Sequence, residues 1–157
     1  MIILGIDPGI ATVGFGVIEY LCGKFRVIEY GTVTSPPHIG MSQRLKLVYD
    51  DMMYVIDKYK PDSIAVEELF FNTNTKTAIM VAQARGVLVL AAENSGVSNF
   101  EYTPLQVKQA VVGYGRADKI QVQQMVKVIL NLQEVPKPDD AADALAIAIC
   151  HAHSAGN

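Results

Sequence analysis

The pattern of hydrophobic and polar positions changes its period several times along the 157 residues, and each period predicts one kind of element. Residues 2–6, 13–20 and 25–34 are rich in β-branched and aromatic side chains, which is typical of strands. Gly23 lies between the second and third runs, where a hairpin needs a turn. The first part of the chain is therefore predicted to form an antiparallel meander.

From Ser42 onward the period becomes helical, and apolar residues recur on one helical face as far as Tyr59. The pair Lys60-Pro61 ends this helix. The pattern then predicts, in order, a strand over 63–69 and helices over 77–93, 120–132 and 140–151. Three antiparallel strands followed by alternating helices and strands predict an α/β domain with a mixed sheet and helices on its faces.

Length and composition favour a single domain over residues 1–157, because half of the residues are hydrophobic and no linker-like tract interrupts them. The apolar start meets Asp7 and Pro8 too soon for a signal peptide, and no apolar run is long enough to cross a membrane. The two cysteines, Cys22 and Cys150, form no disulfide framework and no metal-binding spacing. A reducing cytoplasm is the expected location.

Acidic residues at the ends of predicted strands are the first chemical signal. Asp7 directly follows the first apolar strand, and Glu67 and Glu68 end the strand over 63–69. Neighbouring residues of a strand point to opposite faces, so one of the two glutamates points where Asp7 points if the strands are adjacent.

A second acidic pair opens the last predicted helix. Asp140 and Asp143 are three residues apart and share a helical face, whereas Asp139 is turned away from it. Carboxylates brought together raise one another's pKa unless a cation neutralises them, and Mg²⁺ is a suitable oxygen-seeking ion. Two such ions, about 3.5–4 Å apart, would activate a water and stabilise the leaving oxygen of a phosphodiester.

Each acid taken alone also has a structural interpretation. Asp7 before Pro8 suits a turn, Asp139 or Asp140 suits a helix cap, and Glu68 suits a solvated strand end. The pattern does not establish that the acids meet in space.

Five stretches resemble the RuvC family of Holliday-junction resolvases and occur in that family's order over nearly the whole chain: LGIDPG, VEELFF, QARGV, QVKQAVVGYGRADKIQVQ and DDAADALAIAICHAH. The resemblance implies an RNase H-like fold with a five-stranded mixed β-sheet flanked by α-helices. It also implies an Mg²⁺-dependent endonuclease, with two ions per site and Mn²⁺ as a substitute. As a homodimer, such an enzyme nicks a four-way DNA junction symmetrically and works with the RuvA–RuvB branch-migration complex.

Carried over position by position, the family's acidic tetrad falls on Asp7, Glu67, Asp140 and Asp143. These four are the expected catalytic metal ligands. The resemblance selects Glu67 over Glu68, and it agrees with the helical argument that excludes Asp139.

Basic residues gather around a glycine-containing break before the helix over 120–132. They are Lys108, Arg116 and Lys119, and Asp118 with Gln121 predicts a capping box at the start of that helix. Helix N-terminal amides together with lysines would form a phosphate site, and an ordinary solvated loop is an equal alternative. In the resembling family, lysines that match Lys108 and Lys119 contact DNA near the active site.

An aromatic pair, Phe70 and Phe71, precedes the polar run NTNTKT. Such a pair more often packs into a core, although one ring could stack on an unpaired base. Phe70 matches the family's base-stacking aromatic and is therefore a candidate DNA contact.

Two features of the remaining helices need an interpretation. His151 and His153 are two residues apart and diverge on a helix, so they are predicted to be surface histidines and not metal ligands. The segment 77–92 is apolar around most of its circumference, which suits either a buried helix or a dimer interface. The resemblance favours the dimer interface.

The charge balance disagrees with DNA binding, because 13 Lys and Arg face 16 Asp and Glu. Metal ions would screen four of these acids, and affinity follows the local patch, so the disagreement becomes smaller. Two other classes stay open. GIDPGIATVGFG also resembles the phosphate-binding hairpin of actin-like nucleotide-binding proteins, and another RNase H-like nuclease, for example one that acts on ribosomal RNA, is the second alternative.

Overall fold

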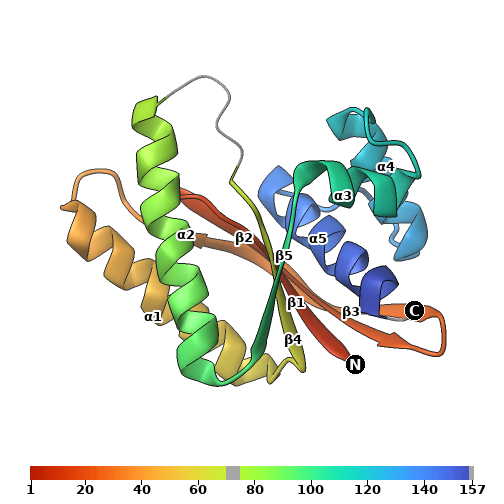
Figure 1. The fold of residues 1–157 in the computed structure, drawn as a ribbon, viewed down its shortest axis with the longest axis horizontal. Coiled ribbons are helices and arrows are strands. Elements are labelled where there is room, and N and C mark those ends of the chain that lie inside the picture. The colour runs from red at the N-terminus through yellow and green to blue at the C-terminus, as the bar shows by residue number, and fades with distance from the viewer. Residues whose placement is uncertain (70–74, 156–157) are drawn as a thin grey trace.

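A computed structural model describes residues 1–69 and 75–155, and its centre is a twisted sheet of five strands (Figure 1). The strands are β1 Ile2–Asp7, β2 Thr12–Leu21, β3 Lys24–Thr34, β4 Ser63–Glu67 and β5 Ser98–Tyr102. They lie in the order β3-β2-β1-β4-β5. The first three strands pair antiparallel, while β4 runs parallel to β1 and β5 runs parallel to β4. The prediction of a five-stranded mixed sheet is confirmed.

Helices cover both faces of this sheet (Figure 1). They are α1 Met41–Tyr59, α2 Thr75–Ser95, α3 Pro104–Val112, α4 Lys119–Ile129 and α5 Asp139–Ala155. Alternate residues of β1 pack into two different cores. Leu4 and Ile6 join the core that includes residues of α1 and α2, whereas Ile3 joins the core that includes residues of α3, α4 and α5.

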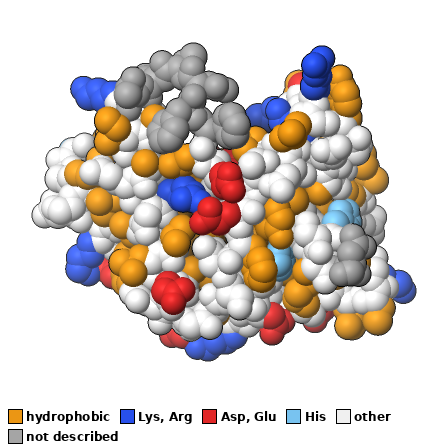
Figure 2. Space-filling model, viewed as in Figure 1, with side chains coloured by type: hydrophobic (Ala, Val, Ile, Leu, Met, Phe, Trp, Pro, Cys, Tyr) orange, Lys and Arg blue, Asp and Glu red, His pale blue; other side chains and the backbone are white. Residues whose placement is uncertain are grey.

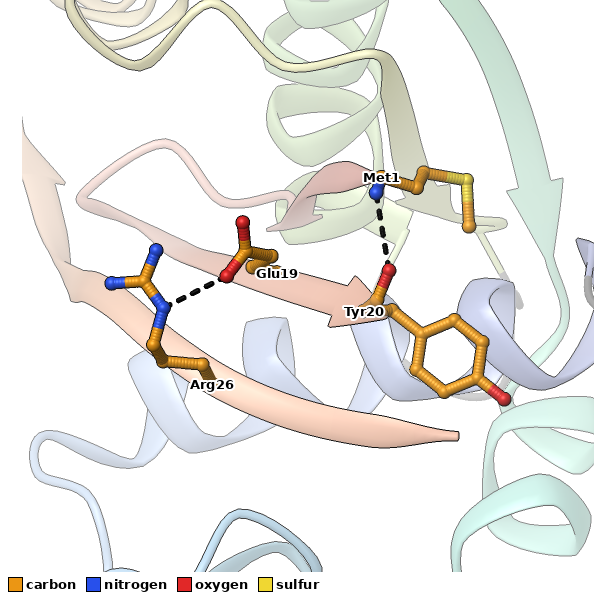
Figure 3. Close-up of polar contacts among 4 residues, drawn as sticks. All are labelled: Met1, Glu19, Tyr20 and Arg26. Atoms are coloured by element: carbon orange, nitrogen blue, oxygen red, sulfur yellow. Dashed lines mark hydrogen bonds and ion pairs between the residues drawn. The ribbon is translucent and has the colours of Figure 1, made fainter. Parts of the chain in front are cut away.

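Local signals in the sequence explain where several elements begin and end. The β2–β3 hairpin turns at Cys22 and Gly23, which both have positive φ, and α1 ends at Lys60 in the left-handed conformation. At the same end of the sheet, the Met1 ammonium donates to the Tyr20 carbonyl at 3.1 Å (Figure 3). These contacts fix the N-terminal strand at the centre of the sheet.

Two glycines allow α5 to lie directly on β1 and β2. A Cβ atom at Gly5 would overlap the backbone carbonyl of Ala144, and a Cβ atom at Gly14 would overlap that of Asp140. Only glycine permits such close backbone approach. As a result, the first turn of α5 lies against the end of β1 where Asp7 is located.

The prediction of two surface histidines is wrong for His151. This side chain is buried, with 2% of its surface exposed, and its Nδ1 atom lies 2.8 Å from the Tyr102 hydroxyl. The reason is that β5 covers this side chain, since the ring centroids of Phe100 and Tyr102 lie 4.4 and 5.9 Å from that of His151. His153, by contrast, is exposed. No helix within residues 1–69 and 75–155 is long and apolar enough to cross a membrane.

Candidate active site

Adjacent strands bring Asp7 and Glu67 together. β1 and β4 are parallel neighbours with Ile6 opposite Val66, so the next residue of each strand is an acid. Both acids follow a residue that faces α1 and α2, and alternation turns them toward α5. Because β1 and β4 are adjacent, one glutamate of β4 does point where Asp7 points, and it is Glu67.

The environment of these acids disfavours negative charge. Burial raises the pKa of Asp7 to about 8, and repulsion by Glu67, Asp143 and Asp140 adds to this effect. Burial also raises the pKa of Glu67 to about 7, with Asp143 as the next cause. The structure thus brings the four predicted carboxylates into one electrostatic cluster.

On the α5 side of the cluster lies Lys119, a residue that the resemblance predicts near the active site. The Lys119 ammonium lies 2.9 Å from Asp143 Oδ2 and 3.5 Å from Asp139 Oδ2. Burial raises the pKa of Asp143 even though its bond to Lys119 acts in the opposite direction. Asp139 therefore shares a cation with Asp143 and is not fully turned away from the site, because Lys119 reaches both side chains from the start of α4.

A pocket of about 260 Å³ lies beside the carboxylates, between the end of β4 and helices α3, α4 and α5. Its lining combines charged and apolar residues: Glu67, Pro104, Val107, Lys108, Lys119, Val122, Asp143 and Ala146. Both lysines lower the pKa of Glu67, which places their positive charge close to its carboxylate. The pocket can therefore accept an anionic group beside the acids.

The donor set fits a hard divalent cation in its chemistry. Four carboxylates supply only oxygen ligands, and their mutual repulsion is relieved by a cation. Within residues 1–69 and 75–155, no three His, Cys, Asp or Glu side chains lie close enough together to hold a metal ion. Binding such an ion would therefore require the carboxylates to move closer together.

Three other predicted features have different outcomes. The Asp118–Gln121 capping box is confirmed, and it uses an α4 amide that was a candidate for phosphate binding, because Asp118 accepts a hydrogen bond from Gln121 N at 2.8 Å. Arg116 is exposed in the connection between α3 and α4 and does not line the pocket. Phe70 lies outside the described residues.

Arg85, in QARGV, suggested only a structural or helix-terminal residue, yet its Nε atom lies 3.2 Å from the Glu67 carbonyl oxygen. The only sign of such a role in the sequence was weak: Arg85 is a basic residue within the mostly apolar sequence of α2. Nothing in the helical period shows which strand end such a side chain reaches.

A mixed five-stranded sheet with carboxylates gathered from β1, β4 and α5 defines a class, the nuclease domains of RNase H-like fold. The chain belongs within this class to the RuvC family, since the family described as crossover junction endodeoxyribonuclease RuvC matches residues 3–151.

Individual relatives agree with this assignment. The crossover junction endodeoxyribonuclease RuvC of Clostridioides difficile is 64% identical over 154 residues, which cover 98% of this chain and 91% of the relative. The solved structure of Thermus thermophilus RuvC superposes with a TM-score of 0.91 at 38% identity, covering 99% of this chain and 96% of the other. A second structure, T. thermophilus RuvC in complex with Holliday junction substrate, has a TM-score of 0.90 at 36% identity over the same shares.

Proposed function

We propose that this chain resolves Holliday junctions as an Mg²⁺-dependent endonuclease, with Asp7, Glu67, Asp140 and Asp143 as its catalytic metal ligands. The observation that carries the proposal is the raised pKa of Asp7, about 8, in a cluster of four carboxylates. A group that strongly disfavours ionisation near neutral pH gains most from a bound cation. Membership of the RuvC family supplies the class of substrate.

In this proposal the protein binds and orients the scissile phosphate. Lys108 and Lys119 line the pocket beside Glu67 and Asp143, so their ammonium groups are placed to hold phosphate oxygens next to the carboxylates. The apolar wall, which includes Val107 and Val122, limits the water that reaches the phosphate. Bound Mg²⁺ would supply charge neutralisation, activation of water and stabilisation of the leaving oxygen.

The homodimer belongs to the same proposal, and α2 supports it. Ile79 and Leu90, two large apolar side chains on this helix, have 57% and 52% of their surface exposed. A shallow groove lined by Leu45, Lys46, Tyr49, Val87 and Leu90 continues this surface onto α1. A second copy of the chain would cover these side chains and place two sites on one junction.

A substitution on α2 tests the dimer. We expect Leu90→Glu to give a monomer in analytical ultracentrifugation, because a charge in an apolar interface disfavours association. Val128→Glu is the control, since Val128 is equally apolar and 66% exposed, but on α4. A Leu90→Glu protein that sediments like the wild type would place the interface elsewhere.

The proposal also keeps three expectations of the sequence: one nuclease domain over residues 1–157, a cytoplasmic location, and cooperation with a branch-migration complex of the RuvA–RuvB type. Of the two alternatives, nucleotide binding is weaker, because the RuvC family matches residues 3–151 of the chain. The second alternative, cleavage of structured RNA by an RNase H-like nuclease, is tested by the RNA hairpin in the experiment below.

The deciding experiment offers the purified protein a synthetic four-way junction, a linear duplex, an RNA hairpin and ATP, each with Mg²⁺ or with EDTA. We expect paired symmetric nicks in the junction with Mg²⁺ and no product in any EDTA reaction. Asp140→Asn should abolish cleavage and retain junction binding, whereas Glu68→Gln should cut at a rate close to wild type. Cleavage of the RNA alone, or normal turnover by Asp140→Asn, would overturn the proposal.

A further inference from the structure

We propose that Arg85 is a positioning residue that fixes the end of β4 and thereby holds the Glu67 carboxylate in its place in the site. This inference rests on the proposed function, since it assigns Arg85 to the same reaction. It concerns a side chain on α2, on the opposite face of the sheet from α5.

Arg85 joins three elements through one guanidinium group. Its Nε atom donates to the backbone carbonyl of Glu67 at 3.2 Å, and its Nη2 atom lies 2.7 Å from Glu101 Oε2 on β5. Only 20% of the Arg85 side chain is exposed, against 42% of Glu101. A half-buried guanidinium with a carboxylate at one side and a carbonyl at the other has a defined orientation, because its donors form a rigid planar fork.

The end of β4 needs such a donor. β4 ends at Glu67, and the next backbone hydrogen bond to β5 is the one from Glu68 N to Tyr102 O at 2.8 Å. Beyond this point the neighbouring strands lead into Pro8 and Pro104, and proline has no backbone N–H. The two prolines therefore interrupt the pairing close to Glu67, the residue whose side chain enters the site.

Arg85 acts on the backbone of Glu67 and not on its carboxylate. The charges that shift the pKa of the Glu67 carboxyl group are those of Asp143, Lys108 and Lys119, and Arg85 is not among them. Those groups lie on the α5 side of the sheet, while Arg85 comes from α2. On the face drawn in Figure 2, acidic and basic side chains lie next to each other near the centre.

Loss of this contact should misplace Glu67 by a small distance while leaving substrate binding intact. A displacement of about 1 Å at a catalytic group can lower the rate about 10²-fold. The DNA-contacting candidates Lys108 and Lys119 are on other elements, so junction affinity should not change. The expected signature is a lower kcat at constant Kd, together with weaker binding of a metal ion by the free protein.

The experiment compares wild type with Arg85→Ala, Arg85→Lys, Glu101→Gln and the Arg85→Ala/Glu101→Gln double variant. For each, single-turnover cleavage, junction Kd, Mn²⁺ binding by electron paramagnetic resonance and thermal unfolding are measured. Arg26→Ala is the control, because it removes a different arginine–glutamate pair, the one with Glu19 at 2.8 Å (Figure 3).

We expect Arg85→Ala to lose about 10- to 100-fold in cleavage rate and to bind Mn²⁺ more weakly, with an unchanged junction Kd. Glu101→Gln should lose less, the double variant should be no worse than Arg85→Ala, and Arg85→Lys should recover part of the rate. Rates and Mn²⁺ affinity equal to wild type in folded Arg85→Ala would overturn the proposal, as would losses that only follow the unfolded fraction. If Arg85→Ala does not fold, Glu101→Gln and Arg85→Lys decide.

Failure of the proposed function gives a different result. In that case wild type itself does not cut the junction, whatever the state of Arg85. The Mn²⁺ measurement then still separates the Arg85 variants from Arg26→Ala.

Discussion

Replacing Asp7 by Asn should destroy cleavage and, at the same time, make the metal-free protein more stable at alkaline pH. The pKa of Asp7 is raised by burial and by three neighbouring acids to about 8, from 3.8 for an unperturbed aspartate. Between these two values the folded chain binds a proton that the unfolded chain has lost, so the free energy of unfolding falls as the pH rises from about 4 to about 8. An asparagine does not titrate, so its free energy of unfolding does not fall in this way as the pH rises.

The size of the effect follows from the shift. A difference of about 4 pKa units at about 1.4 kcal/mol each corresponds to about 6 kcal/mol above pH 8. One unpaired N–H donor of the new amide would offset about 1–3 kcal/mol of this gain. We therefore expect Asp7→Asn to be about 3–5 kcal/mol more stable than wild type near pH 8, and about 1–3 kcal/mol less stable near pH 4, where only the cost of the unpaired donor remains.

Urea unfolding monitored by circular dichroism, in EDTA and at one protein concentration, measures this difference at several pH values. Asp51→Asn serves as the control, because Asp51 is an exposed carboxylate on α1. Added Mg²⁺ should stabilise wild type and not Asp7→Asn, because only a site with all its ligands binds the ion to the folded state. A stability difference between wild type and Asp7→Asn that does not change with pH would refute the reasoning, as would a less stable variant near pH 8.

Three further outcomes test the DNA surface and the packing of α5. The Lys108→Ala/Lys119→Ala variant should lower the slope of log junction affinity against log salt by about two, and an unchanged slope in a binding titration would place the DNA elsewhere. Gly14→Ala should push α5 off the sheet and reduce both melting temperature and cleavage, whereas wild-type values of both would contradict the close approach. Phe70→Ala should lose cleavage of intact junctions more than general DNA binding, because stacking on an unpaired base contributes about 1–3 kcal/mol; fluorescent base analogues at the crossover that respond equally to both proteins would exclude this residue.

The helices and strands that could be predicted are those in which hydrophobic and polar residues alternate with a clear period. The three strands of the meander alternate or are rich in β-branched residues, and α1 has a clear apolar face, so these elements lie close to their predicted bounds. β5 could not be found in this way. Its sequence SNFEY leaves three of five residues exposed, because it is a short edge strand, and only the family resemblance implied a fifth strand.

Strand ends and helical spacing made the acids candidates, whereas the choice of Glu67 over Glu68 and the set of four came from the family resemblance. The partners of these acids were not predictable from periodicity. The contact of Lys119 with Asp139 depends on the angle between α4 and α5, and the contact of Arg85 with the Glu67 carbonyl depends on how α2 crosses the sheet. His151 illustrates the same limit, since helical spacing defines its direction and only the packing of β5 makes that direction buried.

The net charge of −3 is less opposed to DNA binding than the formal count suggests, and the reason lies in the same cluster. With a pKa of about 8, Asp7 is mostly protonated at pH 7 in the metal-free protein, and Glu67, with a pKa of about 7, is protonated about half of the time. The burial that disfavours their charge therefore also removes part of the negative field from the pocket that Lys108 and Lys119 line. Local potential, more than net charge, governs the approach of a phosphate backbone. The metal-free site thus repels DNA less than a fully ionised cluster would, and bound cations would add positive charge where the phosphate must lie.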